Sequence, residues 1–113
     1  MTSMTSSRAV APIVCAPWCR DGDGHASEHQ DDQRCSSAPQ KVLRTLAPQW
    51  GDTDGGWHPS EAEVFVERGP SFPLAVVLYE CGDQDYEVRL TPAEARSLAA
   101  HLIAGADLAE AAR

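Results

Sequence analysis

The sequence predicts an α+β protein in which a zinc-knuckle-like Cys/His segment precedes a three- to four-stranded antiparallel meander, with one C-terminal helix packed on it. Three observations lead to this prediction. Five possible metal ligands lie within residues 15–35, and thiolate and imidazole at short spacings are typical of structural zinc sites. Short apolar or alternating runs fill residues 62–90, as expected of strands. A strong helix-start signal follows at Thr91.

A length of 113 residues is enough for one domain with one modest core. Residues 1–11 are rich in Ser and Thr and are predicted to be a flexible leader. Residues 12–113 are predicted to form a single zinc-stabilised domain. Within it, residues 12–37 are the Cys/His segment, residues 40–91 the β region and residues 92–110 the helix.

The charge of the chain excludes several classes of partner. Its formal net charge is −8 and its pI is about 4.7. A general nucleic-acid binder needs a basic face, and so does a protein that docks on anionic lipid. No run approaches the ~20 apolar residues of a membrane span, and no export signal is visible. We therefore expect a cytoplasmic protein whose cysteines are metal ligands or free thiols.

The β region divides at its Pro and Gly residues. A first strand is predicted at residues 40–47, and Pro/Gly-rich residues 48–60 are predicted to form a loop. Strands are predicted at residues 62–68, at the strongly apolar residues 73–80, and at residues 86–90, where apolar and charged side chains alternate.

The helix has the clearest start in the chain. Thr91 fits the N-cap, Pro92 the first turn, and Glu94 the acidic position of a capping box. We expect the helix to run to about residue 104 or beyond, with Gly105 as a possible end. One apolar stripe follows i+3 and i+4 spacing through Ala95, Leu98, Leu102, Ala106 and Ala109.

The Cys/His segment offers two sets of metal ligands. Both contain Cys15, Cys19 and His25, and the fourth ligand is either His29 or Cys35. The spacing of His25 and His29 suits two imidazoles one helical turn apart, but no strong helix former lies between them. Structural sites favour thiolate, so Cys35 is the preferred fourth ligand and His29 the alternative.

Zinc is the metal that this donor set predicts. Thiolate and imidazole suit tetrahedral zinc, whereas an iron–sulfur cluster prefers four thiolates and Cys81 is far away in the sequence. Four protein ligands leave no position for water, which argues against a catalytic metal. Residues 12–37 contain too few aliphatic side chains to form a core, and metal binding would stabilise them instead.

Two tryptophans and a histidine lie in the Pro/Gly-rich loop. Trp50, Trp57 and His58 could form an interaction surface, since Trp is enriched at binding hot spots. The alternative is that a tryptophan folds back over the small core or the Cys/His segment. The size of the domain favours this second interpretation, because a small core needs its large apolar side chains.

Four stretches together resemble a known family: residues 15–19 (CAPWC), 22–25 (GDGH), 31–35 (DDQRC) and 90–100 (LTPAEARSLAA). They are similar to those of small uncharacterised proteins from high-GC Gram-positive bacteria, which have a C-P-x-W-C-type start and an L-T-x-x-E-A-R-x-L-A helix. Here Ala16 follows the first cysteine and the proline comes one position later. The resemblance implies the fold and a zinc site at Cys15, Cys19, His25 and Cys35. It implies no activity.

The sequence therefore favours a non-enzymatic module that binds an unknown protein partner, with a role accessory to a regulator as the expectation. No Ser/His/Asp arrangement, phosphate loop or carboxylate pair predicts catalysis. One alternative is a thiol or zinc sensor that releases metal on oxidation. A second is a small metalloenzyme, which would require an open coordination position. The oligomeric state is left open.

Overall fold

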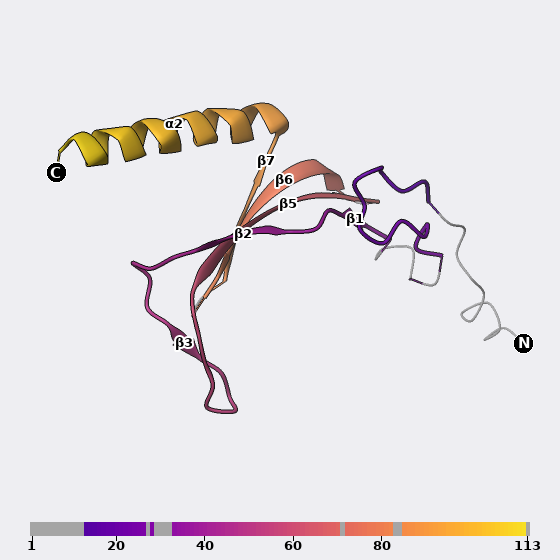
Figure 1. Ribbon diagram of the computed structural model, residues 1–113. Helices are drawn as coiled ribbons and strands as arrows, with labels where there is room; N and C mark the ends of the chain where they lie inside the picture. The colour runs from indigo at the N-terminus through magenta and orange to yellow at the C-terminus, as the bar shows by residue number, and fades with distance from the viewer. Residues whose placement is uncertain (1–12, 27, 29–32, 71, 83–84, 113) are drawn as a thin grey trace, which may run out of the picture.

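The computed structural model describes residues 13–26, 28, 33–70, 72–82 and 85–112. It confirms the predicted α+β class: an antiparallel sheet is followed by a single C-terminal helix, and the Cys/His segment lies at one end of the sheet (Figure 1). The elements in chain order are β1 (Cys35–Ser36), β2 (Gln40–Leu43), β3 (Trp50–Gly51), β4 (Trp57–His58), β5 (Glu61–Gly69), β6 (Phe72–Cys81), β7 (Tyr86–Leu90) and α2 (Pro92–Ala111).

The three longest strands form the predicted meander. β5 pairs with β6 and β6 with β7, all antiparallel. Val64 of β5 lies opposite Leu78 of β6, which lies opposite Val88 of β7. Because side chains alternate between faces, this register places apolar side chains from all three strands on one face of the sheet.

Strand β5 also carries the two N-terminal strands on its other edge. Both β1 and β2 pair with it antiparallel, one after the other. Cys35 of β1 lies opposite Arg68, and Gln40 of β2 lies opposite Val64. The Cys/His segment is thereby attached to the far end of β5 (Figure 1).

Two predictions within the β region need correction. The first strand ends at Leu43 and does not continue to residue 47. Residues 48–60 are not a plain loop, because Trp50 pairs with His58 and Gly51 with Trp57. Asp52 closes the intervening turn by accepting hydrogen bonds from the backbone N–H groups of Asp54 and Gly56. These residues form a short arm that extends away from the main sheet (Figure 1).

The helix begins as predicted and continues past its glycine. Thr91 Oγ1 accepts a hydrogen bond from the backbone N–H of Glu94, whose side chain accepts one from the backbone N–H of Thr91. This is a complete capping box with Pro92 in the first turn. Gly105 does not end the helix, which reaches Ala111.

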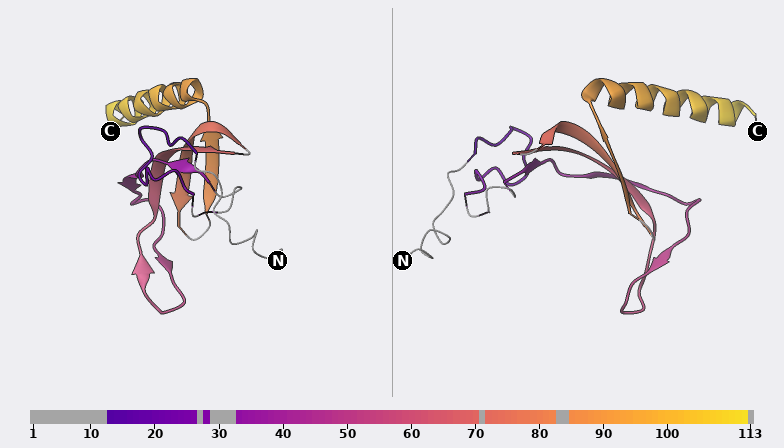
Figure 2. Two further views of the ribbon diagram at one scale, coloured as in Figure 1. Left: turned by 90° about the vertical axis from the view of Figure 1, so that its right-hand side faces the viewer. Right: turned by 180° about the vertical axis from the view of Figure 1, so that it is seen from behind.

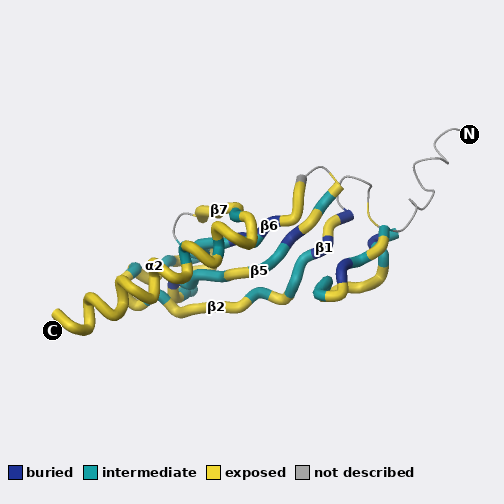
Figure 3. The backbone as a smooth tube through the Cα atoms, turned by 90° about the horizontal axis from the view of Figure 1, so that it is seen from above, coloured by how far each residue is buried: buried dark blue, intermediate teal, exposed yellow. Residues whose placement is uncertain are grey.

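The helix contacts the sheet at its start and then extends beyond it. The views from the side and from behind show its C-terminal half clear of every strand (Figure 2). None of its residues is buried, and only Ala95 and Leu98 are partly covered (Figure 3). The helix therefore packs on the sheet only through its first turns.

Little apolar surface is fully enclosed. Among the described residues the buried apolar side chains are Ala16, Cys35, Ala75 and Val77. Two of these belong to the Cys/His cluster and its surroundings, and two to the central strand β6. The described helix lacks an apolar stretch long enough to cross a membrane.

Candidate metal centre

A tight turn brings the first two cysteines together. The backbone N–H of Cys19 donates to the carbonyl oxygen of Ala16 at 3.0 Å, which closes the turn between Cys15 and Cys19. The backbone N–H of Gly24 donates to Cys15 Sγ at 3.2 Å. Such a hydrogen bond favours the thiolate, which is the form that binds metal.

Left-handed backbone conformations turn the chain back toward these cysteines. Gly22 and Gly24 have φ angles of 64° and 77°, and His25 has a φ angle of 54°. Glycine adopts this region freely, whereas a histidine there is strained. Asp23 supports the turn, because its Oδ1 accepts a hydrogen bond from the backbone N–H of His25 at 3.0 Å.

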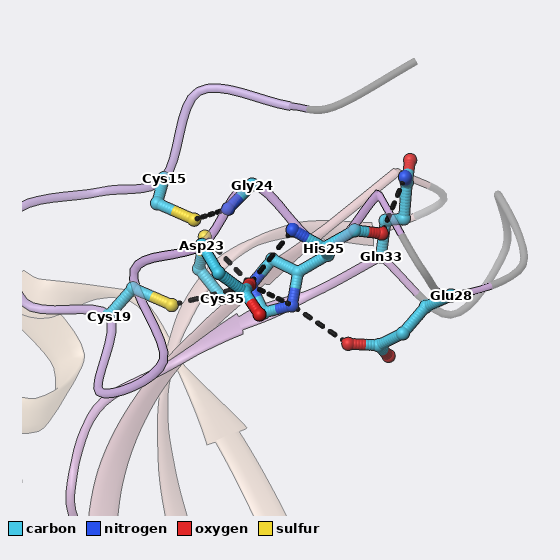
Figure 4. A network of polar contacts seen from close by, with 8 residues as sticks. All are labelled: Cys15, Cys19, Asp23, Gly24, His25, Glu28, Gln33 and Cys35. Carbon is cyan, nitrogen blue, oxygen red and sulfur yellow. Dashed lines mark hydrogen bonds and ion pairs between the residues drawn. The ribbon is translucent and has the colours of Figure 1, made fainter. Parts of the chain in front are cut away.

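Four side chains converge at this turn (Figure 4). One donor atom from each of Cys15, Cys19, His25 and Cys35 lies within 4.8 Å of the other three. His25 Nε2 lies 3.4 Å from Cys19 Sγ and 3.9 Å from Cys35 Sγ. A tetrahedral ion with bonds of about 2.3 Å to sulfur and 2.0–2.1 Å to nitrogen requires sulfur–nitrogen separations of roughly 3.5 Å. The four residues could therefore hold a metal ion.

The two ends of the cluster differ in exposure. His25 and Cys35 are buried, with 1% and 0% of their surface exposed. Cys15 and Cys19 are half-buried. The structure brings Cys15, Cys19, His25 and Cys35 together, as their predicted role requires, and their binding of a metal stays a prediction. The alternative ligand His29 lies outside the described residues.

Glu28 orients the imidazole of His25. Its Oε1 lies 2.8 Å from His25 Nδ1, which leaves Nε2 directed at the sulfur atoms (Figure 4). A metal-binding histidine commonly donates its other N–H to a carboxylate in this way. Gln33, which is buried, donates from Nε2 to the carbonyl oxygen of His25 at 2.8 Å and fixes the backbone of the ligand.

The pKa values of the two half-buried thiols shift in opposite directions. Burial raises the pKa of Cys15. Burial also raises the pKa of Cys19, but hydrogen bonds from the Gly22 backbone and from His25 outweigh it and lower that pKa to about 6. The hydrogen bonds with Glu28 and Cys19 raise the pKa of His25 to about 9, against the effect of burial. A metal ion would displace the proton on Nε2, because ligands bind in their deprotonated form.

Backbone and ionic contacts fix the cluster to the sheet. The backbone N–H of Arg20 donates to the carbonyl oxygen of Ser36 at 3.0 Å, and Arg68 donates from Nη2 to the carbonyl oxygen of Val14 at 2.8 Å. Glu67, beside this junction, is buried and accepts a hydrogen bond from Arg89 of β7 at 2.8 Å. The turn that carries Cys15 and Cys19 is thus held by β1 and β5 together.

The predicted interaction residues lie far from the metal centre, on the arm formed by β3 and β4. The rings of Trp50 and His58 stack with their centroids 4.6 Å apart, and His58 Nε2 lies 2.6 Å from Asp52 Oδ2. Trp57 is 71% exposed. The interpretation that a tryptophan folds back over the core is therefore wrong for Trp57, because its strand carries it away from the main sheet (Figure 1).

Sequence reasoning missed the residues that support the ligands. Glu28 follows His25 by three residues, a spacing at which two side chains can meet within one turn. That spacing was the sequence signal from which the contact of Glu28 with His25 could have been predicted. The role of Gln33 depends on the folded path of residues 25–33 and has no local signature.

One comparison with known proteins gives a match. A family model described as a domain of unknown function, DUF6907, matches residues 2–113. Neither the curated proteins nor the solved structures that were compared yielded a match. The expected resemblance to a family of small uncharacterised proteins is confirmed at this level, and the bacterial group stays a prediction.

Proposed function

The chain belongs to the DUF6907 family, and we propose that it is a small zinc-stabilised module that binds a protein partner and has no enzymatic activity. The observation that carries this proposal is the convergence of four protein donors at one point. Three thiolates and one imidazole fill a tetrahedral shell. No position then remains for a water or substrate molecule.

Zinc is the metal that fits these donors best. The set of Cys15, Cys19, His25 and Cys35 contains only sulfur and nitrogen, which are the usual ligands of structural zinc. Calcium and magnesium require oxygen ligands instead. The separations from His25 Nε2 to the sulfur atoms, 3.4 and 3.9 Å, straddle the value that zinc requires.

The surroundings of the cluster support a structural role for the metal. Only Ala16 and Cys35 are buried apolar residues in the described part of the segment before β2. Zinc binding is worth roughly 10 kcal/mol or more in small peptides, enough to order a segment of this size. The metal would therefore take the place of a hydrophobic core at this end of the sheet.

The arm formed by β3 and β4 is the surface that we assign to the partner. Trp57 offers a large exposed aromatic side chain, the type enriched at hot spots. The stack of Trp50 on His58 and the contact of His58 with Asp52 hold the arm in one shape. A preorganised surface loses less entropy on binding, which favours recognition.

The first test is the metal itself. The full chain is purified without chelator and its metal content is measured by mass spectrometry. We expect one zinc per chain, with the segment before β2 losing its dispersed amide signals when zinc is chelated. A chain that keeps those signals without bound metal contradicts the structural role.

The second test concerns the partner. Zinc-loaded wild-type chain, Trp57→Ala and Leu108→Ala are used to capture proteins from an extract of the source organism. The captured protein is then purified and titrated. Leu108 is also highly exposed but lies on the helix, so it is the matched control. We expect Trp57→Ala to weaken binding roughly thirtyfold, as for a hot-spot residue. Equal affinity of wild type and Trp57→Ala contradicts the assignment of the arm.

A redox sensor is the second candidate, and the partial exposure of Cys15 and Cys19 favours it. In this function, hydrogen peroxide takes two electrons from two thiolates, which form a disulfide. The peroxide O–O bond breaks, and two protons from the solvent complete two waters. Loss of two ligands would release the metal. Mild peroxide would then release zinc in step with disulfide formation. Retention of zinc after every accessible thiol has been oxidised excludes this candidate.

A further inference from the structure

Strand β7 (Tyr86–Leu90) forms an outer edge of the main sheet. It is the last strand in the sheet order, and among the described residues it pairs only with β6. The helix packs on a face of the sheet and does not lie along this edge (Figure 3). The backbone N–H and C=O groups along such an edge can form hydrogen bonds with one further strand.

This edge has few of the features by which proteins prevent strand addition. Its five residues, YEVRL, include neither Pro nor Gly. Its register with β6 is regular from Tyr86 to Leu90, without the irregularity that β5 shows between Glu67 and Gly69. Proteins protect edge strands with Pro, with bulges or with charges that repel an added strand. Here only charges are present, so their order determines which strand can be added.

The charges of β7 are opposite in sign and symmetric about Val88. Glu87 precedes this residue and Arg89 follows it. If two β7 strands pair antiparallel with a two-fold axis at Val88, Glu87 of each copy lies opposite the partner's Arg89. Opposite charges at directly opposed positions stabilise a strand pair, whereas like charges there destabilise it. The strand is therefore complementary to itself.

The register centred on Val88 is favoured over its neighbours. A two-fold axis one residue earlier would oppose two copies of Glu87, and an axis one residue later would oppose two copies of Arg89. The favoured register also pairs the whole strand, because Tyr86 then lies opposite the partner's Leu90. Val88 and Leu90 share the face of the sheet that carries Leu78, so the apolar side chains of both copies would meet on that face.

We propose that a second copy of this chain pairs antiparallel with β7 about Val88, so that the protein is a homodimer with one sheet continuous through both copies. The chain carries a net charge of −8, but β7 contains one acid and one base and is neutral. Arg89 also contacts Glu67 and Glu87 of its own chain. A guanidinium has five N–H donors and can contact the partner's Glu87 as well.

This interface is separate from the metal centre and from the arm that we assign to a protein partner. The metal centre adjoins β1, and β5 and β6 lie between β1 and β7 in the sheet order. The arm is a second, two-stranded sheet. Failure of the homodimer would therefore leave the proposed function standing, and the reverse is also true.

The first experiment is sedimentation equilibrium of the full zinc-loaded chain over a wide concentration range. We expect a reversible equilibrium between monomer and dimer. A chain that stays monomeric at every concentration overturns the proposal. This measurement needs no variant, so a folding defect cannot obscure it.

A disulfide then tests the position of the axis. Directly opposed residues of antiparallel strands have Cα atoms about 4.5–5.5 Å apart, within the range of about 4.4–6.8 Å that a disulfide spans. Val88→Cys in a Cys81→Ser background should therefore form a covalent dimer when oxidised glutathione accepts the two electrons. Tyr86→Cys in the same background is the control, because each copy of this position lies four residues out of register with the other. Peptide mapping identifies the joined thiols. No covalent dimer with Val88→Cys, or an equal yield with Tyr86→Cys, overturns the proposal.

A charge reversal tests the pairing of Glu87 with the partner's Arg89. Glu87→Arg would oppose arginines at both positions, and we expect it to weaken dimerisation more than about tenfold. Glu110→Arg makes the same charge change at the far end of α2 and should leave dimerisation unchanged. Circular dichroism confirms that both variants are folded. A dimer that both variants weaken equally, or that neither weakens, overturns the proposal.

Discussion

His25 and Glu28 form the contact that decides which nitrogen of the imidazole faces the sulfur atoms. Glu28 Oε1 lies 2.8 Å from Nδ1, while Nε2 lies 3.4 Å from Cys19 Sγ. When a metal displaces the proton from Nε2, the proton on Nδ1 stays with the carboxylate, and the neutral imidazole presents the lone pair of Nε2 to the cluster. The first prediction follows from this contact.

Glu28→Gln should lower zinc affinity by about 10- to 100-fold without changing the stoichiometry, since the charged acceptor at Nδ1 is lost but all four ligands remain. Competition with a chromogenic chelator measures the affinity. Asp21→Asn is the control, because it removes a carboxylate from the same segment, four residues before His25. Equal losses in the two variants would show that net charge, and not the contact with His25, determines affinity.

The ligand set gives the second prediction. Cys35→Ser should abolish stoichiometric zinc binding, because Cys35 Sγ is fully buried beside His25 Nε2. His29→Ala should retain one zinc per chain, since four donors remain without it. Cys81→Ser is the thiol control, on β6 and apart from the cluster. Mass spectrometry measures the zinc content of each variant and so identifies the fourth ligand. Loss of zinc in His29→Ala together with its retention in Cys35→Ser would reverse the assignment.

The third prediction concerns two glycines whose replacement by alanine should change the stability of the chain in opposite directions. Gly22 has a φ angle of 64°, so Gly22→Ala should destabilise the zinc-loaded chain by about 1 kcal/mol through backbone strain. Gly105 lies inside α2, and no atom lies within 4 Å of a Cβ added there. Gly105→Ala should therefore stabilise the helix by about 0.5–1 kcal/mol.

Urea unfolding of the zinc-loaded chain measures both changes, and an unchanged m-value would show that the compactness of the end states is the same. A destabilised Gly105→Ala would contradict the open surroundings of this position, where no atom lies within 4 Å of an added Cβ.

The sequence predicted those parts of the structure that have local signals. The capping box at Thr91 and Glu94 requires only residues three apart, and it is present. The strands at residues 62–68, 73–80 and 86–90 follow from apolar patterning, and β5, β6 and β7 match them within one residue at each end. The convergence of Cys15, Cys19, His25 and Cys35 was predictable because short spacing limits the conformations of that segment.

Features that depend on long-range packing were not predictable in the same way. Gly105 suggested a helix end, but helix formers on both sides carry α2 to Ala111. The loop composition of residues 48–60 concealed the pairing of Trp50 with His58, because a two-residue strand leaves almost no pattern. That pairing is what carries Trp57 away from the core and exposes it.

Tyr79 gives the last prediction, which concerns pH. Its hydroxyl donates to Asp85 Oδ2 at 2.7 Å, and this hydrogen bond, together with burial, raises the pKa of Tyr79 to about 12. The chain has two tyrosines, so Tyr86→Phe leaves Tyr79 as the only one. In that background, ultraviolet absorbance should show tyrosinate forming near pH 12. Adding Asp85→Asn should bring the pKa toward the ordinary value of about 10.

The hydrogen bond between Tyr79 and Asp85 also makes the free energy of unfolding depend on pH. Below about pH 10, Tyr79 is protonated in both the folded and the unfolded chain, so the contribution of its raised pKa is fully present. Between about pH 10 and 12 the unfolded chain loses the proton first, and the free energy of unfolding falls as pH rises. Asp85→Asn should remove this part of the slope. An absorbance titration that is the same with and without Asp85→Asn would mean that the hydroxyl does not contact that carboxylate in solution.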